Sequence, residues 1–372
     1  MSDESRPTGN RREFLTGRAV RKEVEWVGEQ IADEILENAD SLPPAAGPSV
    51  RLGTTAMAAD FVIMMNPGPA EQVMNASDVL EEVHQLEQEM TVYKSDGELF
   101  QLNQSAEPKI AQEVSPRLFE VVRDALEVAH KTEGAYDPTS GPLIDLWRLA
   151  RRENRVPTDQ EINDCLKHCG HHHVSLDAES TTVAFHVPHL QLNLGGIGKG
   201  FALDVLGEGL LEREETNWMM HGGKSSLLAH GSHHSLEGWP VGVRNPLFPK
   251  ERLATILLRN QGMSTSGAGV QFFRHEGKRY GHILDPRTGI PAENVLSVTV
   301  LAPSAAVADA LSTAFFVMGL EKTREYCDNF PDIGVLLIPP PKQGRRLQVH
   351  TFNLPDQTLF LSDHSEQIDE TL

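Results

Sequence analysis

The stretch Leu192–Asp204, with the sequence LNLGGIGKGFALD, places four glycines within six residues between an apolar run and a helix-like segment. Glycines at a strand-to-helix turn let backbone N–H groups approach an anion, and the positive end of the following helix dipole attracts it. Lys199 adds a positive charge at the same place. The pattern indicates a phosphate-binding loop, although it is also typical of a tight turn whose glycines serve only close packing.

This loop matches neither of two common nucleotide-binding motifs. A P-loop requires G-x-x-x-x-G-K-[ST], and the dinucleotide fingerprint requires G-x-G-x-x-G. Neither spacing occurs in Leu192–Asp204. If the loop binds a phosphate, it therefore does so through a motif other than these two.

The segments around the loop predict a mixture of helices and strands. Apolar residues at helical spacing predict helices over residues 76–90, 115–132 and 199–211. Short apolar runs predict strands at residues 56–66, 174–176, 182–185, 191–194, 254–258 and 295–302. Because helices and strands do not alternate strictly, the order favours an α+β fold over a doubly wound parallel sheet.

A further helix is predicted between Ser304, which suits an N-cap, and Gly319, which suits a C-terminal stop. Asp309 and Thr313 stand four residues apart and therefore share one face of this helix. Carboxylate and hydroxyl oxygens are hard donors of the kind that Mg²⁺ prefers. The alternative is that Thr313 bonds its own helix carbonyl while Asp309 meets solvent or a basic partner.

A third segment of interest, Arg279–Pro291, carries His282 ahead of a turn marked by Asp285, Pro286 and Gly289. We expect His282 to lie on a short strand that enters this turn. A histidine near neutral pH can deprotonate a hydroxyl or bind a flavin or phosphate oxygen. A hydrogen-bonded structural histidine beside a turn would give the same pattern.

Cysteine and histidine residues suggest a metal site at first sight, through Cys165, Cys169 and the run His171–His173. Neither their spacing nor a second ligand pair matches a structural zinc site, and the same holds for the pair His233 and His234. We interpret the first segment as a helix end and a turn that lead into a strand at Val174. The three cysteines are too few for a disulfide framework.

The charge balance excludes some classes of partner. The 372 residues include 33 Lys and Arg against 53 Asp and Glu, which gives a formal net charge of −20. Nucleic-acid binding depends on basic side chains that neutralise phosphates, so we expect no nucleic-acid partner. No run approaches the roughly 20 consecutive apolar residues of a membrane helix, and we expect no membrane span.

The composition predicts that both ends of the chain lie outside a central domain. Residues 1–50 are polar and end in a proline-bearing linker, and residues 356–372 read as a polar tail. Arg11 and Arg12 resemble a twin-arginine export signal, but charged residues follow where an apolar segment should stand. This favours the cytoplasm, and a functional export signal would place the protein in the periplasm instead.

Taken in order, the segments resemble the ApbE family of FAD:protein FMN transferases. Residues 56–59 stand where the family has its Met-Gly-Thr strand, and residues 93–103 are similar to its Tyr-x-x-x-Ser-Glu-Leu-x-x-Leu-Asn stretch. Residues 134–143 are similar to its Gly-Ala-Phe-Asp-Pro-Thr-x-Gly-Pro-Leu motif. The glycine loop then precedes residues 221–223, residues 265–267, the His282 turn and the Asp309 helix in the family's order.

The resemblance implies an α+β, T-fold-like domain of mixed sheets packed with helices over residues 51–355. It implies that FAD is the substrate, that Mg²⁺ is required, and that FMN passes to a Ser or Thr hydroxyl of an acceptor flavoprotein with release of AMP. His282 would be the catalytic base, and Gly196, through its carbonyl, would hold Mg²⁺ with Asp309 and Thr313. The FAD site would be lined by Met57, Tyr93, Ala135, Tyr136, Asp137, Asn193 and Lys199.

The chain departs from the family pattern at four positions. The family usually has Asp at Asn193, Ala at Gly198, Asp at Lys224 and a polar residue at Ala268. These departures leave two alternatives to FMN transfer open. One is an FAD pyrophosphatase that yields FMN and AMP, and the other is an FAD-binding protein with impaired catalysis.

Overall fold

The computed structural model describes residues 48–105, 107–269, 272–341, 347–354, 357–361 and 368–370. The expected N-terminal extension, with Arg11 and Arg12, lies outside these residues except for its last three positions. Within the described part of the chain, no helix is long and apolar enough to cross a membrane.

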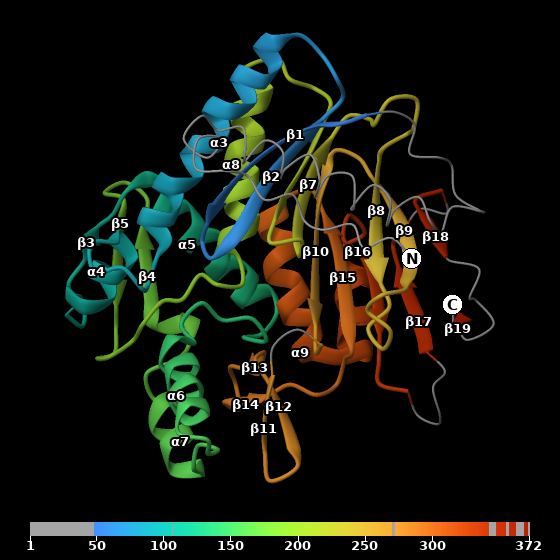
Figure 1. Ribbon diagram of the computed structural model, residues 1–372. Coiled ribbons are helices and arrows are strands. Elements are labelled where there is room, and N and C mark those ends of the chain that lie inside the picture. The colour runs from blue at the N-terminus through green and yellow to red at the C-terminus, as the bar shows by residue number, and fades with distance from the viewer. Residues whose placement is uncertain are drawn as a thin grey trace, which may run out of the picture. The chain divides into compact units, whose positions relative to one another are not determined.

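Among the described residues, a nine-stranded sheet forms the centre of the molecule (Figure 1). Neighbouring strands in it are antiparallel except for the pair β17 and β19, which is parallel. In spatial order the strands are β1 (Val50–Ala56), β2 (Ala59–Met65), β6 (Trp218–Gly222), β7 (Ser226–His230), β10 (Gln261–Gly267), β15 (Ser297–Ala302), β16 (Gly334–Ile338), β17 (Leu347–Phe352) and β19 (Ile368–Glu370).

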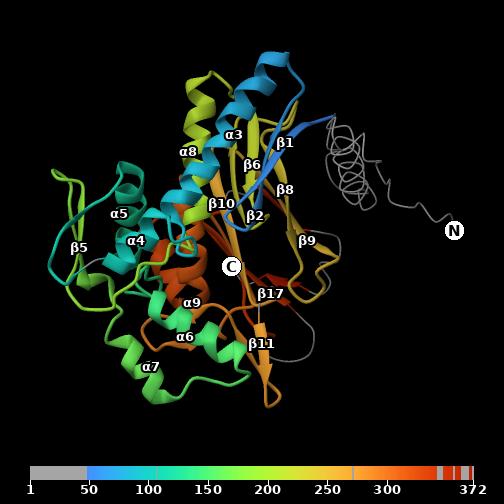
Figure 2. The same cartoon turned by 60° about the vertical axis from the view of Figure 1, so that its left-hand side comes forward.

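Both faces of this sheet are covered, as the two ribbon views show (Figures 1 and 2). Residues Trp218 and Met220 of β6 pack in one core cluster with the helices, whereas Met219 between them packs in a second cluster. A strand buried on both sides carries a continuous apolar run, which is the case for β6. The covering elements are helices α3 (Ala70–Met90), α8 (Gly198–Glu212) and α9 (Ala305–Asn329) on one face, and strands β8 (Trp239–Arg244), β9 (Arg252–Leu258) and β18 (Leu359–Leu361) on the other.

Smaller units surround this framework. Trp147 of α6 packs with Ile162 of α7 and Leu284 of β13 in a third apolar cluster. The other elements are α4 (Glu98–Ser105), α5 (Pro116–Lys131), α6 (Gly141–Arg152), α7 (Asp159–Leu166), η1 (His171–His173), a sheet of β3 (Gln112–Glu113), β5 (Thr182–Phe185) and β4 (Val174–Asp177), and the hairpins β11 (Phe272–His275) with β12 (Lys278–Gly281) and β13 (Leu284–Asp285) with β14 (Ile290–Pro291).

The predicted α+β fold is confirmed, and so are the predicted helices, which correspond to α3, α5, α8 and α9. Ser304 caps α9 as expected, since its side chain accepts a hydrogen bond from the Val307 N–H. Gly319 has a positive φ of 75° and interrupts the helical geometry, but a second helical segment follows it to Asn329. The glycine therefore makes a kink rather than the predicted stop.

Two predicted strands and the predicted tail need correction. Residues 56–66 contain a turn at Met57 and Ala58, so they supply the end of β1 and all of β2. The predicted strand 191–194 is reduced to a single bridge between Gln191 and Ser140. Within the predicted tail 356–372, β18 pairs with β9 and β19 pairs with β17, because both sheets offer an open edge there.

Two glycines let the start of α9 approach α8 and the central sheet. A Cβ atom built on Gly200 of α8 would overlap the backbone of Ala305 and lie 2.7 Å from the Ala306 Cα. A Cβ on Gly262 of β10 would likewise meet the backbone of Ala305. The N-terminus of α9 is therefore held at backbone contact distance, which only residues without a side chain permit.

This packing predicts unequal effects of two similar substitutions on α8. Gly200→Ala should lower the free energy of unfolding by roughly 3 kcal/mol, because the new methyl group meets rigid backbone. Gly198→Ala is the matched control, because its Cβ would lie 3.5 Å from the Met90 Sδ, an ordinary contact. The control should be neutral or stabilising by up to about 1 kcal/mol. Urea denaturation measures both, and equal stability of the two variants would contradict the close packing.

Candidate functional site

Asp309 of α9 lies buried where four elements meet. Its Oδ1 accepts hydrogen bonds of 2.9 Å from the hydroxyls of Ser226 on β7 and Ser264 on β10. Its Oδ2 accepts a bond of 3.2 Å from the backbone N–H of Gly200 on α8. The Asp309 side chain is 7% exposed, and these hydrogen bonds offset the free-energy cost of burying its charge.

Lys199 brings a positive charge to the same carboxylate. Its Nζ lies 3.6 Å from the Asp309 Oδ2. A Cβ on Gly222 would lie 3.6 Å from the Lys199 Cβ, and one on Gly223 would lie 3.9 Å from its Cδ. The glycine loop, the Gly222–Gly223 turn and α9 therefore converge at one place.

Gly196, Thr313 and Tyr136 meet beside this carboxylate. A Cβ built on Gly196 would lie 3.4 Å from the Thr313 Oγ1 and 3.1 Å from the Tyr136 Cε2. Thr313 stands one helical turn after Asp309 on α9. Three residues that the sequence places in the site are therefore neighbours in space, and the missing side chain of Gly196 keeps room between the other two.

The glycine loop is shaped by Asn193 and by the segment around Pro138. The Asn193 Oδ1 accepts a 2.9 Å hydrogen bond from the Gly195 N–H, which closes a local turn. The Asn193 N–H donates to the Pro138 carbonyl at 2.7 Å. This bond and the Gln191–Ser140 bridge hold the Tyr136 segment against the loop. Asn193 thus acts on the backbone of the loop.

Asp137 is fully engaged in holding its own turn. Its Oδ1 accepts from the Thr139 N–H and hydroxyl at 2.8 and 2.6 Å, and its Oδ2 accepts from the His171 N–H at 2.8 Å. Burial raises the pKa of Asp137, but the hydrogen bonds from His171 and Thr139 lower it overall below the ordinary value. The structure therefore places this carboxylate as the anchor of the segment that carries Ala135, which is itself fully buried, and Tyr136.

Met57 is connected through Glu87 of α3 to Lys94, the residue that follows Tyr93. The Met57 N–H donates to the Glu87 Oε1 at 2.9 Å, and the Lys94 Nζ lies 2.7 Å from the Glu87 Oε2. Tyr93 is 69% exposed, and its hydroxyl accepts a bond of 2.7 Å from Arg148. The β1–β2 turn reaches the Gly222–Gly223 turn, since the Gly223 N–H donates to the Asp60 carbonyl at 2.9 Å.

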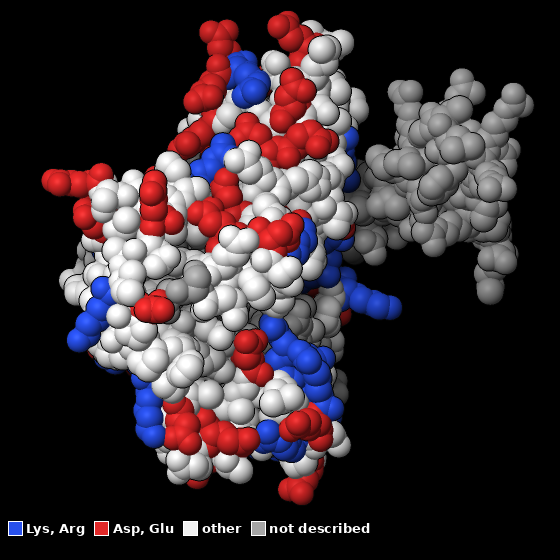
Figure 3. All heavy atoms as spheres, turned by 90° about the vertical axis from the view of Figure 1, so that its left-hand side faces the viewer, with Lys and Arg blue, Asp and Glu red and all other residues white. Residues whose placement is uncertain are grey.

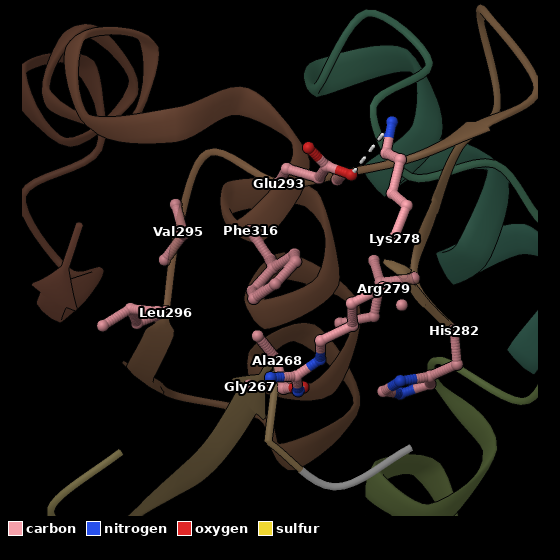
Figure 4. Close-up of a pocket in the computed structure, with 12 residues that line it drawn as sticks. Gly267, Ala268, Lys278, Arg279, His282, Glu293, Val295, Leu296 and Phe316 are labelled. Atoms are coloured by element: carbon pink, nitrogen blue, oxygen red, sulfur yellow. Dashed lines mark hydrogen bonds and ion pairs between the residues drawn. The ribbon is translucent and has the colours of Figure 1, made fainter. Parts of the chain in front are cut away.

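His282 lies in a bend just after β12, rather than on the strand expected, at the side of a pocket of about 320 Å³. Figure 4 shows its imidazole turned toward Gly267 and Ala268. Phe316 of α9 lines the same pocket, seven residues after Asp309 and therefore on the same helix face. At 1.5 Å per residue, the pocket begins about 10 Å along the helix from Asp309.

Sequence reasoning missed the serine hydroxyls around Asp309. Besides Ser226 and Ser264, the hydroxyls of Ser266 and Ser312 lie 2.9 Å apart, and Ser312 donates to the Asp309 carbonyl at 2.9 Å. Ser264 and Ser266 are two apart on β10 and so face the same side. A run of three hydroxyl residues, Ser264, Thr265 and Ser266, within a strand was the available signal.

The Cys and His segment is confirmed as a turn. Helix α7 ends at Leu166, η1 covers the histidine run and β4 begins at Val174. Across the described residues, no group of three or more His, Cys, Asp or Glu side chains is arranged to hold a metal ion.

The Asp309 neighbourhood offers a different donor set, which suits Mg²⁺. Thr313 and the backbone at Gly196 add oxygen atoms beside a single carboxylate. Mg²⁺ is commonly held by one or two carboxylates, with substrate phosphates and water completing its shell. The residues present therefore fit an ion that arrives with a phosphate-bearing substrate.

Comparison with known proteins identifies the family of this chain. A model of the ApbE family matches residues 54–337. The chain belongs to the ApbE family. The ApbE relative from Haemophilus influenzae, named FAD:protein FMN transferase, is 34% identical over 64% of this chain and 71% of its own length. One from Vibrio cholerae with the same name is 33% identical over 74% of this chain and 81% of its own.

Solved ApbE structures share the fold. The ApbE protein of Thermotoga maritima has a TM-score of 0.71 at 31% identity, covering 78% of this chain and 94% of its own. The flavin transferase ApbE of Vibrio cholerae has a TM-score of 0.70 at 29% identity, covering 81% and 97%.

Asp204 of α8 ties the two helices of this ApbE site together. Its carboxylate accepts hydrogen bonds from the Ser304 hydroxyl at 2.7 Å and from the N–H groups of Ala305 and Ala306, both at 2.8 Å. It therefore caps α9, the helix that carries Asp309. Burial raises the pKa of Asp204 to about 6, although these hydrogen bonds oppose the rise.

This raised pKa predicts a pH-dependent contribution to stability. The folded protein holds the proton of Asp204 more tightly than the unfolded chain does, so the contribution is complete below about pH 4 and is lost as the pH rises through about 6. The free energy of unfolding is measured for wild type and for Asp204→Asn, which cannot titrate at this position, at about pH 7.5 and about pH 4.5. At the lower pH, wild type should gain roughly 2 kcal/mol of stability relative to the variant. A difference that does not change with pH would contradict the raised pKa.

Proposed function

We propose that this ApbE chain transfers the FMN half of FAD to a Ser or Thr hydroxyl of an acceptor flavoprotein, with Mg²⁺, and releases AMP. The observation that carries the proposal is the convergence of the glycine loop, Lys199 and the Asp309–Thr313 face of α9. The names of the relatives support the same reaction class.

The positive groups of the site suit a pyrophosphate. Lys199 and the N-terminal end of α8 stand beside the room that Gly196 leaves open. Figure 3 shows acidic and basic side chains interspersed over one face of the molecule. Because the formal net charge is −20, we assign the neutralisation to the local groups of the site. When bound, Mg²⁺ would supply further neutralisation, held by Asp309, Thr313 and the carbonyl of Gly196.

We assign His282 the role of the base that takes the proton of the acceptor hydroxyl. The acceptor oxygen forms a bond to the phosphorus of the FMN half, while the bond from that phosphorus to the bridging oxygen breaks and AMP leaves. The proton of the hydroxyl passes to the imidazole of His282, since a histidine ring accepts a proton near neutral pH. The pocket beside His282 gives an acceptor segment access to this ring.

An assay with FAD, Mg²⁺ and an acceptor domain that can be flavinylated tests the proposal. We expect a covalently yellow acceptor and one AMP per flavin bound, and removal of Mg²⁺ with EDTA should stop both. Free FMN with AMP would favour a pyrophosphatase, and bound but unchanged FAD would favour a binding protein with impaired catalysis. Absence of FAD binding would contradict all three functions.

The role of His282 predicts a separation between binding and transfer. His282→Ala should slow transfer at least about a hundredfold, as expected for loss of a general base, while the Kd for FAD changes less than about threefold. His275→Ala, on the neighbouring strand β11, is the matched control and should keep the rate. Single-turnover kinetics and flavin fluorescence measure the two quantities. Equal losses in both would make His282 a binding residue.

A further inference from the structure

Tyr136 lies at the centre of the site and presents a polar atom that the protein itself does not use. The residue is 4% exposed, and its ring edge lies against Gly196. Its hydroxyl oxygen is buried and has no hydrogen-bond partner among the described residues. A buried hydroxyl without a partner is costly and therefore calls for an explanation.

The nearby carboxylates do not supply this partner. Asp137 is occupied by Thr139 and His171, and Asp309 is occupied by serine hydroxyls and the Gly200 N–H. A tyrosine hydroxyl carries no charge near neutral pH. The hydroxyl is therefore a neutral donor that lacks an acceptor.

The surroundings select the kind of acceptor. Thr313 lies close to Gly196, since a Cβ built on Gly196 would be 3.4 Å from the Thr313 Oγ1, and α8 begins two residues later at Gly198. A helix N-terminus and a lysine favour an anion with several oxygen atoms over a carbonyl or an aromatic ring. Phosphate oxygens meet this requirement.

We propose that the Tyr136 hydroxyl donates a hydrogen bond to a phosphate oxygen of the bound nucleotide's pyrophosphate, an assignment that rests on the proposed function. The bond adds a donor without adding a full charge next to Asp309. It makes Tyr136 a residue that recognises the phosphate part of the substrate and not its flavin ring. A hydrogen bond to a charged oxygen is among the stronger ones in proteins.

The test compares three ligands on wild type and on Tyr136→Phe, which keeps the ring and removes the oxygen. FAD carries flavin, pyrophosphate and adenosine, ADP carries pyrophosphate and adenosine without flavin, and riboflavin carries flavin without phosphate. We expect the Kd values for FAD and ADP, measured by calorimetry with Mg²⁺, to rise about tenfold to a hundredfold, and that for riboflavin to stay the same. The melting temperature without ligand should stay equal or rise, because an unpaired buried hydroxyl is lost.

Tyr326→Phe is the control, because Tyr326 packs against Phe315 and Phe330 farther along α9. It should change none of the three Kd values. Unchanged FAD and ADP affinities in Tyr136→Phe would overturn the inference, as would a change confined to riboflavin or to the Mg²⁺ concentration needed. If wild type fails to bind FAD while Tyr136→Phe still weakens ADP, the proposed function fails and the phosphate contact stands.

Discussion

The buried carboxylate of Asp309 is the constraint on which the rest of the site depends. Its two oxygens draw hydrogen bonds from two strands and from the first turn of α8, with Lys199 close by. Removal of any of these donors would leave a buried charge short of partners, which is strongly destabilising. The hydrogen bonds that offset the burial of this charge also hold the glycine loop against α9. Formation of the site is therefore coupled to packing of α8 against α9.

This arrangement explains how a protein with a net charge of −20 can receive a pyrophosphate. In the proposed site, neutralisation would come from Lys199, the N-terminus of α8 and nearby hydroxyl donors rather than from a basic surface. The Tyr136 hydroxyl can donate a hydrogen bond without adding a charge. A second lysine at its position would instead pair with the Asp309 carboxylate. Short-range donors act at the ligand and do little to the field elsewhere.

The parts of the site that are local in sequence could be predicted, and the parts that depend on pairing could not. Each of two patterns lies within one short segment: four glycines around Lys199, which indicate an anion site, and Asp309 four residues before Thr313, which indicates a shared helix face. Ser226 and Ser264 reach Asp309 only because β7 pairs with β10 in one register. The tail prediction over residues 356–372 is wrong for a different reason, because Leu359, Phe360 and Leu361 form an apolar run that was a strand signal in the sequence itself.

The structure also bears on the departure at Asn193, where related proteins usually have Asp. The amide oxygen of Asn193 accepts the Gly195 N–H at 2.9 Å, which is what one carboxylate oxygen would do. The substitution therefore removes a charge while it keeps the turn and the neighbouring bond to Pro138. Asp309 itself keeps hydrogen bonds from Ser226, Ser264 and the Gly200 N–H. The backbone around Asn193 is therefore an ordered turn, and the departure leaves no local disruption of the glycine loop.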